Sequence, residues 1–436
     1  MQGHESKHRP DNEARHLLLV GFNYHRTPIA IRERAVIPES CLTHALHELK
    51  QLAHVKEAVV LSTCNRTEVY AVVSDTSQGM RELDQFFKTV QTINGHEPLQ
   101  PNFRLMHDDV ALHIFRVASG LDSLVLGEGQ IMSQVKSAHR AALKASTIGP
   151  VLDQLFNMAL RCGKRVRTET DISRRAASSS VSSAAIDLAR QLFAGKMNKQ
   201  VLIIGAGTVS KLCMKKLLHD KNSNDVITML NRNGERFKYF PESRQSAPAR
   251  LKFSTDYDER HKMAAKADLI IVGTSAPDFV LQAEEMRKLA CGKEIAVIDL
   301  SVPRNVDPRI EEIQNIKVFH IDHLRKIVDW APEKIDKVIA EAEKLVFEQL
   351  EQFNAWWTSL STTATIIDFR KRFDEIRSKQ ILRSGSKNSR VDLEKLSVQM
   401  MNQFLHEPIV QLKATTDRRL LDERNSAIRT LFRLGS

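Results

Sequence analysis

The chain has 436 residues, with 64 lysines and arginines against 53 aspartates and glutamates, for a formal net charge of +11. Its 42% hydrophobic content is enough for several buried cores, which excludes disorder as the global state. Five scattered cysteines without a CxxC pair exclude a disulfide scaffold and indicate no metal site, and the apolar runs are far too short to span a membrane.

The first part of the chain alternates predicted strands and helices. Residues 1–16 are polar, and we expect them to form a disordered leader. Short apolar runs predict strands at 17–21, 58–61 and 69–73. A polar loop that contains Cys64 lies between the last two of these strands. This pattern predicts a small α+β domain with the loop at its centre.

Helical spacing dominates from residue 109 to residue 167, with one break at Gly149 and Pro150. The stretch 161–175 is basic, with six lysines and arginines against two acidic residues. Such a stretch is typical either of a solvated helix face or of a contact with nucleic-acid phosphates. We assign residues 17–175 to the first domain.

Residues 176–325 repeat a strand-then-helix order. Near-continuous apolar runs predict five buried strands of a parallel sheet with helices on both faces, as in a Rossmann-type domain. The runs are 201–204, 226–230, 269–272, 295–300 and 318–321.

A glycine-rich turn of the GxGxxG type follows the first of these strands, with serine in the third glycine position. Its residues are Gly205, Ala206, Gly207, Thr208, Val209 and Ser210. Arg232 follows the second strand, where an acidic residue would bind the ribose of NAD, and its cation suits the 2′-phosphate of NADP. The alternatives are a fold that has lost its cofactor and, for Arg232, a surface charge.

From residue 326 to residue 436 the chain is predicted to be all-helical. Glycine nearly disappears, and apolar residues recur every three to four positions from Ile335 to Phe353. Long helices of this kind form bundles or dimer seams. The fold class is therefore multidomain α/β plus α: an N-terminal α+β domain, a Rossmann-type parallel-sheet domain and a C-terminal all-helical domain.

Cys64 is the cysteine whose surroundings best suit a reactive thiol. Its neighbours Thr63 and Asn65 are polar, and we expect Arg66 to lower the pKa of the thiol. The alternative, a buried small hydrophobic residue, suits the other cysteines better. A second polar cluster follows along the chain, and a helix there would put its two glutamines on one face. It contains His113, Ser123, Glu128, Gln130 and Gln134.

Several long motifs resemble those of glutamyl-tRNA reductase, and the resemblance covers nearly the whole chain from Leu17. They are LSTCNRTE at 61–68, GLDSLVLGEGQI at 120–131, GKRVRTET at 163–170, DLSVPRN at 299–305 and FLHEP at 404–408. The resemblance implies NADPH-dependent reduction of glutamyl-tRNA to glutamate-1-semialdehyde, the first committed step of tetrapyrrole biosynthesis by the C5 pathway. It also implies a V-shaped homodimer in which a long spinal helix carries catalytic, NADPH-binding and dimerisation domains.

The resemblance also assigns roles to individual residues. Cys64 matches the nucleophile that forms a thioester, and His113 matches a histidine critical for activity. The turn 205–210 matches the NADP-binding segment. Gly129 stands where many members have proline, although plant-type members also have glycine. The positions that match substrate-binding residues are Thr63, Asn65, Arg66, Ser123, Glu128, Gly129, Gln130 and Gln134.

Two other functions compete with this one: a tRNA-independent NADP-linked semialdehyde dehydrogenase, and a catalytically silent tRNA-binding paralogue. The resemblance further implies glutamate-1-semialdehyde aminomutase as a partner that could receive the product by channelling. It implies a cytoplasmic location in bacteria, or the plastid stroma if a transit peptide has been removed. No metal is expected.

Overall fold

The structure is a computed structural model, and the chain divides into two compact units, one spanning His16–Val346 and one containing Phe347–Ser436. The expected leader lies outside the described residues except for Arg15 and His16, and His16 already begins the first strand. The described residues are 15–93, 100–123, 126–173, 181–193, 198–220, 224–240, 248–290, 292–324, 332–383, 390–414 and 417–434.

The N-terminal part of the larger unit is a four-stranded antiparallel sheet of order β2-β3-β1-β4. Its strands are β1 (His16–Asn23), β2 (Val55–Ser62), β3 (Arg66–Val73) and β4 (Phe103–Met106). Every residue of β3 is buried, because helices cover both faces of the sheet. The sequence did not predict β4, whose four residues are too few to show a period.

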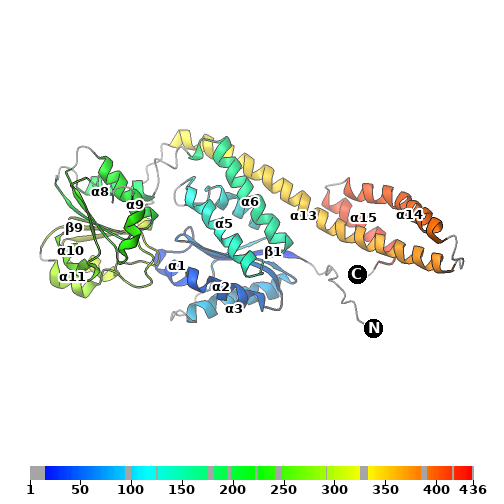
Figure 1. Ribbon diagram of the computed structural model, residues 1–436, viewed down its shortest axis with the longest axis horizontal. Helices are drawn as coiled ribbons and strands as arrows, with labels where there is room; N and C mark the ends of the chain where they lie inside the picture. Colours follow the sequence, from blue (N-terminus) through cyan, green and yellow to red (C-terminus); the bar gives the residue numbers. More distant parts are fainter. Residues whose placement is uncertain are drawn as a thin grey trace. The chain divides into compact units, whose positions relative to one another are not determined.

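Helices α1 (Ile29–Ala35), α2 (Glu39–Lys50) and α3 (Thr76–Ile93) lie on one face of this sheet (Figure 1). The other face is covered by α4 (Asp108–Ala118), α5 (Gly129–Lys144) and α6 (Pro150–Glu169). Pro150 begins α6, in agreement with the expected break and with the preference of proline for the first helical turn.

The second part of the larger unit is a six-stranded parallel sheet of order β10-β9-β8-β5-β6-β7. This confirms the predicted parallel sheet. The strands are β5 (Gln200–Ile204), β6 (Val226–Leu230), β7 (Leu251–Ser254), β8 (Leu269–Val272), β9 (Ile295–Asp299) and β10 (Ile316–His320). The last strand begins and ends earlier than expected, because Ile321 already starts the short helix α12 (Ile321–Leu324).

Alternate residues of these strands face two separate cores. Val201 and Ile203 pack with α8 (Val181–Leu192) and α9 (Thr208–His219), whereas Leu202 and Ile204 pack with α10 (Arg260–Lys266) and α11 (Ala283–Leu289). The sheet is therefore wound on both faces. Its strand order reverses between β5 and β8, and ligands of such sheets bind beyond the carboxyl ends of the strands at this point.

The C-terminal part of the chain is helical, as predicted. Helix α13 (Pro332–Arg383) has 52 residues, which corresponds to about 78 Å of helix. Helices α14 (Arg390–Lys413) and α15 (Arg418–Leu431) follow, and Ile366, Phe369 and Leu405 are in the core of the smaller unit. Among the described residues, no helix is long and apolar enough to cross a bilayer.

The apolar face of the first turns of α13 is buried within the larger unit. Val338, Ala342 and Val346 are at most 6% exposed, and Glu343 forms an ion pair with Arg116 of α4. This part of the face therefore packs on its own chain and is not available as a dimer seam. The side chain of Ile335 lies outside the described residues, as do both expected domain boundaries, 175/176 and 325/326, which stay predictions.

Candidate active site

Cys64 lies at the tip of the β2–β3 hairpin. Thr63 fixes this turn, because its Oγ1 accepts hydrogen bonds from the backbone N–H groups of Asn65 (3.1 Å) and Arg66 (3.2 Å). The N–H of Thr63 donates in return to the carbonyl of Arg66, at 2.8 Å. The thiol is half-buried and packs against an apolar cluster formed by Ile29 and Ile321.

Arg66 is the first residue of β3 and is buried, so it is not the loop cation that the sequence suggested. Its Nη1 lies 2.9 Å from Oε1 of Glu68 and 3.1 Å from Oδ2 of Asp122. Its Nη2 donates to the backbone carbonyl of Asp122. The guanidinium therefore holds two carboxylates from different elements, and only its Nε has no hydrogen-bond partner among the described residues.

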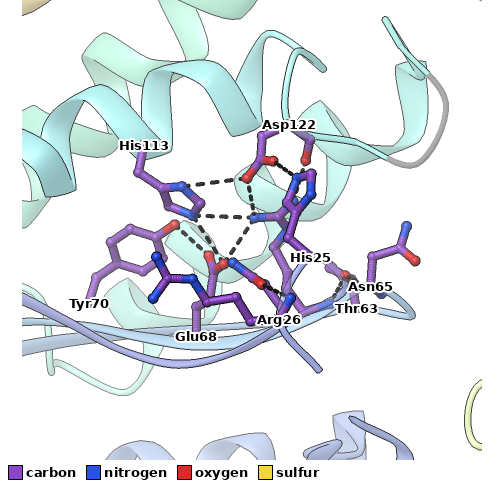
Figure 2. A network of polar contacts seen from close by, with 10 residues as sticks. His25, Arg26, Thr63, Asn65, Glu68, Tyr70, His113 and Asp122 are labelled. Carbon is purple, nitrogen blue, oxygen red and sulfur yellow. Dashed lines mark hydrogen bonds and ion pairs between the residues drawn. The ribbon is translucent and has the colours of Figure 1, made fainter. Parts of the chain in front are cut away.

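His113 of α4 points into the same network (Figure 2). Its Nε2 lies 3.0 Å from Oε1 of Glu68, and its Nδ1 lies 3.5 Å from Oδ2 of Asp122. Phe103 packs on the imidazole, with the ring centroids 5.0 Å apart. Each ring nitrogen of His113 thus faces a carboxylate, which fixes the orientation of the ring.

Four members of this network were not predicted from the sequence: His25, Glu68, Tyr70 and Asp122. Tyr70 donates a hydrogen bond to Glu68 (2.8 Å), and His25 lies 2.6 Å from Asp122. The pKa of Asp122 is held well below its usual range: burial acts against ionisation, but the hydrogen bond from His25 and the charge of Arg66 outweigh it. The one signal in the sequence was a glutamate at position 68, directly before the apolar run 69–73.

Glu128 caps the N-terminus of α5, and burial raises the pKa of its carboxyl group. The pKa of Cys64 is raised to about 11, first by burial and then by the charge of Glu128, while Arg32 and Arg66 act in the opposite direction. Arg66 thus lowers the pKa of this thiol, as expected, but the net shift is upward. The cation is present, but burial and Glu128 have the larger effect.

The loop before α5 is closed by two glycines in the left-handed region. Gly120 (φ +74) accepts a backbone hydrogen bond of 2.9 Å from Gly127 (φ +75), and Arg167 of α6 donates to the carbonyl of Gly127. A Cβ at Gly129 would lie 3.1 Å from Nη1 of Arg167. Arg167 therefore supports this loop and is not a free cation of the basic stretch.

The remaining predicted substrate residues lie in the same loop and on helix α5. Ser123 lies in the loop, and Gln130 and Gln134 are one turn apart on α5, as the expected helix requires. Glu128 is near enough for its charge to raise the pKa of the Cys64 thiol. Among the described residues, no cluster of His, Cys, Asp and Glu side chains could hold a metal ion.

The glycine-rich turn has the geometry that a dinucleotide requires. Gly205 has φ +111, and a Cβ there would lie 2.3 Å from the carbonyl oxygen of Gly273. Gly207 caps α9, and a Cβ there would meet only that oxygen, at 3.7 Å, so the backbone around it is open to a ligand. A pyrophosphate fits the N-terminus of α9, which Thr208 and Val209 begin.

Two other predicted cofactor residues differ in what they contact. Ser210 is fully buried and its Oγ donates to the carbonyl of Gly273 at 3.1 Å, so its side chain joins α9 to the sheet. Close helix–strand packing is the role of the third glycine in the motif. Arg232 is exposed after β6, and its guanidinium carbon lies 5.0 Å from the ring centroid of Tyr257. Stacking on Tyr257 orients this cation at the carboxyl edge of the sheet.

Three family models match consecutive parts of the chain. They are the N-terminal domain of glutamyl-tRNAGlu reductase at residues 20–170, shikimate/quinate 5-dehydrogenase at 187–327, and the dimerisation domain of glutamyl-tRNAGlu reductase at 341–434.

Similarity to whole proteins extends over nearly the full chain. Glutamyl-tRNA reductases of Acaryochloris marina and Cyanothece sp. are 36% and 37% identical over 429 and 427 residues, which is 96% of this chain and 97% of each relative. The solved structure of glutamyl-tRNA reductase from Methanopyrus kandleri matches 96% of this chain and 98% of its own, with 26% identity and a TM-score of 0.50.

Proposed function

The chain belongs to the glutamyl-tRNA reductase family, and from that membership we propose that Cys64 takes the glutamyl group from glutamyl-tRNA as a thioester and releases it as glutamate-1-semialdehyde. The protein is thus an oxidoreductase of the C5 route to tetrapyrroles. The observation that carries the residue assignment is the position of Cys64, at a hairpin tip that packs against Ile321 of the parallel-sheet part.

In the first step, Sγ of Cys64 attacks the carbonyl carbon of the aminoacyl ester. A carbon–sulfur bond forms and the bond between the carbonyl carbon and the ribose oxygen breaks. The thiol proton is transferred overall to that oxygen, and uncharged tRNA leaves. The product is a thioester, which accepts hydride more readily than an ester does.

In the second step, the thioester carbonyl carbon accepts a hydride, which a bound reduced nicotinamide would supply. The carbon–sulfur bond then breaks, and Cys64 leaves as thiolate while the aldehyde forms. The acyl carbon is reduced by two electrons, and the thiolate regains a proton before the next cycle. Cys64 is therefore unchanged over the whole reaction.

Glu128 suits the α-ammonium of the glutamyl group as an anionic partner. Burial is the largest cause of the raised pKa of Cys64, and the charge of Glu128 is the second. A cation bound at Glu128 would neutralise this charge and lower the pKa of the thiol. We propose that the substrate activates the Cys64 nucleophile in this way. Neutral contacts to the glutamyl group would come from Thr63, Asn65, Ser123, Gly129, Gln130 and Gln134.

Arg66 suits the side-chain carboxylate of the substrate, but Glu68 and Asp122 already engage it. The side chain of Glu68 is 0% exposed and that of Asp122 is 13% exposed. We propose that the substrate carboxylate approaches from the side of Asp122, the accessible partner. His113 keeps Glu68 and Asp122 in place by contacting both.

A nicotinamide cofactor follows from the family, and we propose that it is NADPH. Arg232, at the end of β6, is a cation where NAD-specific sheets carry an acid, and it would pair with the 2′-phosphate. Gly205, Ala206, Gly207, Thr208 and Val209 would hold the pyrophosphate through the backbone, with Ser210 packing the helix behind them.

The experiment that tests this function supplies glutamyl-tRNA and NADPH and measures glutamate-1-semialdehyde, with and without prior ribonuclease treatment. Loss of product after ribonuclease supports the tRNA-dependent reaction. Undiminished product would favour a tRNA-independent dehydrogenase, and no product with intact tRNA would favour a silent paralogue. A homodimer, channelling to an aminomutase and a cytoplasmic or plastid-stromal location remain proposals of the same kind.

A further inference from the structure

Two neighbouring residues of α1 carry opposite charges, and each pairs with the parallel-sheet part of the larger unit. Arg32 contacts Asp322 through both guanidinium nitrogens, Nη2–Oδ1 at 2.9 Å and Nη1–Oδ2 at 3.3 Å. Glu33 accepts from Arg304 three times: from its backbone N–H at 3.1 Å, from Nε at 3.0 Å and from Nη2 at 2.7 Å. We call these four residues the α1 clasp.

The α1 clasp is better enclosed than an ordinary surface ion pair. The side chains of Arg304 and Glu33 are 19% and 16% exposed, and that of Arg32 is 3% exposed. Both contacts are bidentate, which fixes direction as well as distance. Exposed single ion pairs contribute little, whereas this geometry can hold two parts of a chain in one orientation.

The clasp flanks Cys64. Ile29 of α1 and Ile321, which precedes Asp322, form the apolar cluster against which Cys64 packs, together with Val302, two residues before Arg304. The loop of Val302 and Arg304 is itself held by Asp299, which accepts backbone hydrogen bonds from Ser301, Asn305 and Val306. The loop after β9 and helix α12 after β10 thus supply the clasp residues Arg304 and Asp322, and also Val302 and Ile321 of the apolar cluster against the thiol.

The loop after β9 and helix α12 lie on one side of the strand-order reversal, and Arg232 lies on the other. The turn 205–210 follows β5, Arg232 follows β6 on one side of β5, and β8, β9 and β10 lie on the other side. A dinucleotide with its adenosine phosphate at Arg232 and its pyrophosphate at β5 extends its nicotinamide toward β8 and β9. Cys64 packs with Val302 after β9 and with Ile321 after β10, which is this side of the sheet.

We propose that the α1 clasp holds the Cys64 hairpin against the nicotinamide half of the crevice, and that Arg32, Glu33, Arg304 and Asp322 are positioning residues for hydride transfer. This proposal rests on the proposed function. Acyl transfer from tRNA to Cys64 needs no cofactor, whereas hydride transfer requires the thioester and the nicotinamide at close range. Misplacement by about 1 Å can cost on the order of 100-fold in such a step.

The test uses Glu33→Arg, Arg304→Glu and the double variant that exchanges the two charges, all in the full-length chain. This pair is chosen because the charge of Arg32 also acts on the Cys64 thiol. Three quantities are measured: single-turnover transfer of labelled glutamate from tRNA to protein without NADPH, semialdehyde formation with NADPH, and the NADPH dissociation constant.

Each single variant should keep acyl transfer and NADPH affinity within about twofold of wild type and lose roughly 10- to 100-fold in semialdehyde formation. The exchanged pair should recover most of that loss. In the cofactor-free protein, amide hydrogen exchange in α1 and in the loop after β9 should be faster in the single variants and slower again in the exchanged pair. If a charge-reversal variant does not fold, Asp322→Asn offers a milder change in the other ion pair of the clasp. It should likewise reduce semialdehyde formation and keep acyl transfer and NADPH affinity.

Arg104→Glu is the matched control. It breaks an ion pair inside the N-terminal part, in which Nη2 of Arg104 contacts both carboxylate oxygens of Asp84 at 2.9 and 3.1 Å, and should leave all three quantities unchanged. Equal losses of acyl transfer and reduction in the clasp variants, or no loss of reduction at all, would overturn the positioning role. Absence of acyl transfer in the wild type would instead count against the proposed function.

Discussion

Glu128 opposes the ionisation of Cys64: after burial, its carboxylate is the largest influence that raises the pKa of the thiol to about 11. At neutral pH the nucleophile is therefore a thiol, and neutralising Glu128 would remove the largest cause other than burial of its raised pKa, which favours the thiolate. An α-ammonium group of the substrate has the charge to do this. The arrangement protects the thiol from alkylation and oxidation between turnovers, because only the thiolate reacts readily.

Glu128→Gln should make Cys64 more reactive. Removing the carboxylate lowers the pKa of Cys64, and well below that pKa each unit of decrease raises the thiolate fraction about tenfold. Alkylation by iodoacetamide at pH 8, followed by peptide mass spectrometry, should therefore be several-fold faster at Cys64 in the variant. The exposed Cys41 is the internal reference and should react equally in both proteins. Unchanged alkylation of Cys64 would show that burial alone sets its reactivity.

Cys64→Ser should abolish reduction and the transfer of labelled glutamate to protein, because a serine hydroxyl forms no thioester. Binding of tRNA should stay within about twofold of wild type, since the hairpin turn is held by Thr63 and not by the thiol. Filter binding and single-turnover labelling measure the two quantities. Full reductase activity in this variant would exclude the thioester route.

Arg232→Ala should raise the Michaelis constant for NADPH and leave that for NADH nearly unchanged. Losing a charge-assisted contact with the 2′-phosphate costs about 1.5–3 kcal/mol, which corresponds to roughly 10- to 150-fold. Steady-state kinetics with both cofactors measure the difference. Arg236→Ala is the control, because Arg236 is an exposed neighbour on the 3-10 helix Gly234–Tyr239. Equal use of NADH and NADPH by the wild type would contradict the assignment.

Strands that are near-continuous apolar runs were predictable from the sequence, whereas helix α1 and strands β4 and β7 were not. The parallel strands β5, β6, β8 and β9 are near-continuous apolar runs and were located to within about a residue at most ends. Strands β4 and β7 have four residues each, as β8 does, but a basic residue interrupts the apolar run in both, and the seven residues of helix α1 are too few for a helical period to emerge. Yet α1 carries Arg32 and Glu33, two of the four charges of the clasp, so the sequence pattern missed an element that we propose to be functionally important.

In the candidate site, the sequence likewise did not predict which side chains are buried or which residues they contact. The motif around Cys64 pointed to the proposed nucleophile, but Arg66 was placed in a loop because strand β3 begins three residues before the predicted strand 69–73. Asp122 and Glu68 pair with Arg66 across 56 and 2 residues of sequence, and no local pattern predicts the longer contact. Likewise, the apolar face of α13 indicated packing without indicating the partner.

Replacing Phe404 and Leu431 with aspartate should shift the protein from dimer to monomer. These side chains are 69% and 76% exposed in the smaller unit, which is large for apolar residues and typical of an interface. Analytical ultracentrifugation at micromolar concentration measures the change. Helical content by circular dichroism should be retained, because the core of this unit uses Phe369, Leu405 and Ile409 instead. A wild type that is monomeric at that concentration would contradict the proposed dimer.

Arg161 and Lys164 are the residues of the basic stretch that we expect to contact tRNA. Both are exposed on α6, whereas Arg165 pairs with Glu169 and Arg167 supports the carbonyl of Gly127. Arg174 and Arg175 lie outside the described residues. Of the basic stretch 161–175, we therefore expect only these two side chains, which are one helical turn apart, to contact tRNA phosphates.

Arg161→Ala combined with Lys164→Ala should weaken tRNA binding and flatten its dependence on salt. Each phosphate contact contributes about 0.7–0.9 to the slope of log K against log salt, so the loss of two should reduce that slope by roughly one to two. Titrations from low to moderate salt measure it. Arg167→Ala serves as a contrast: because it loosens the loop before α5, it should reduce thioester formation with no change in the salt slope. An unchanged slope in the double variant would assign both residues to a solvated helix face and direct the search for tRNA contacts to the basic C-terminal helices.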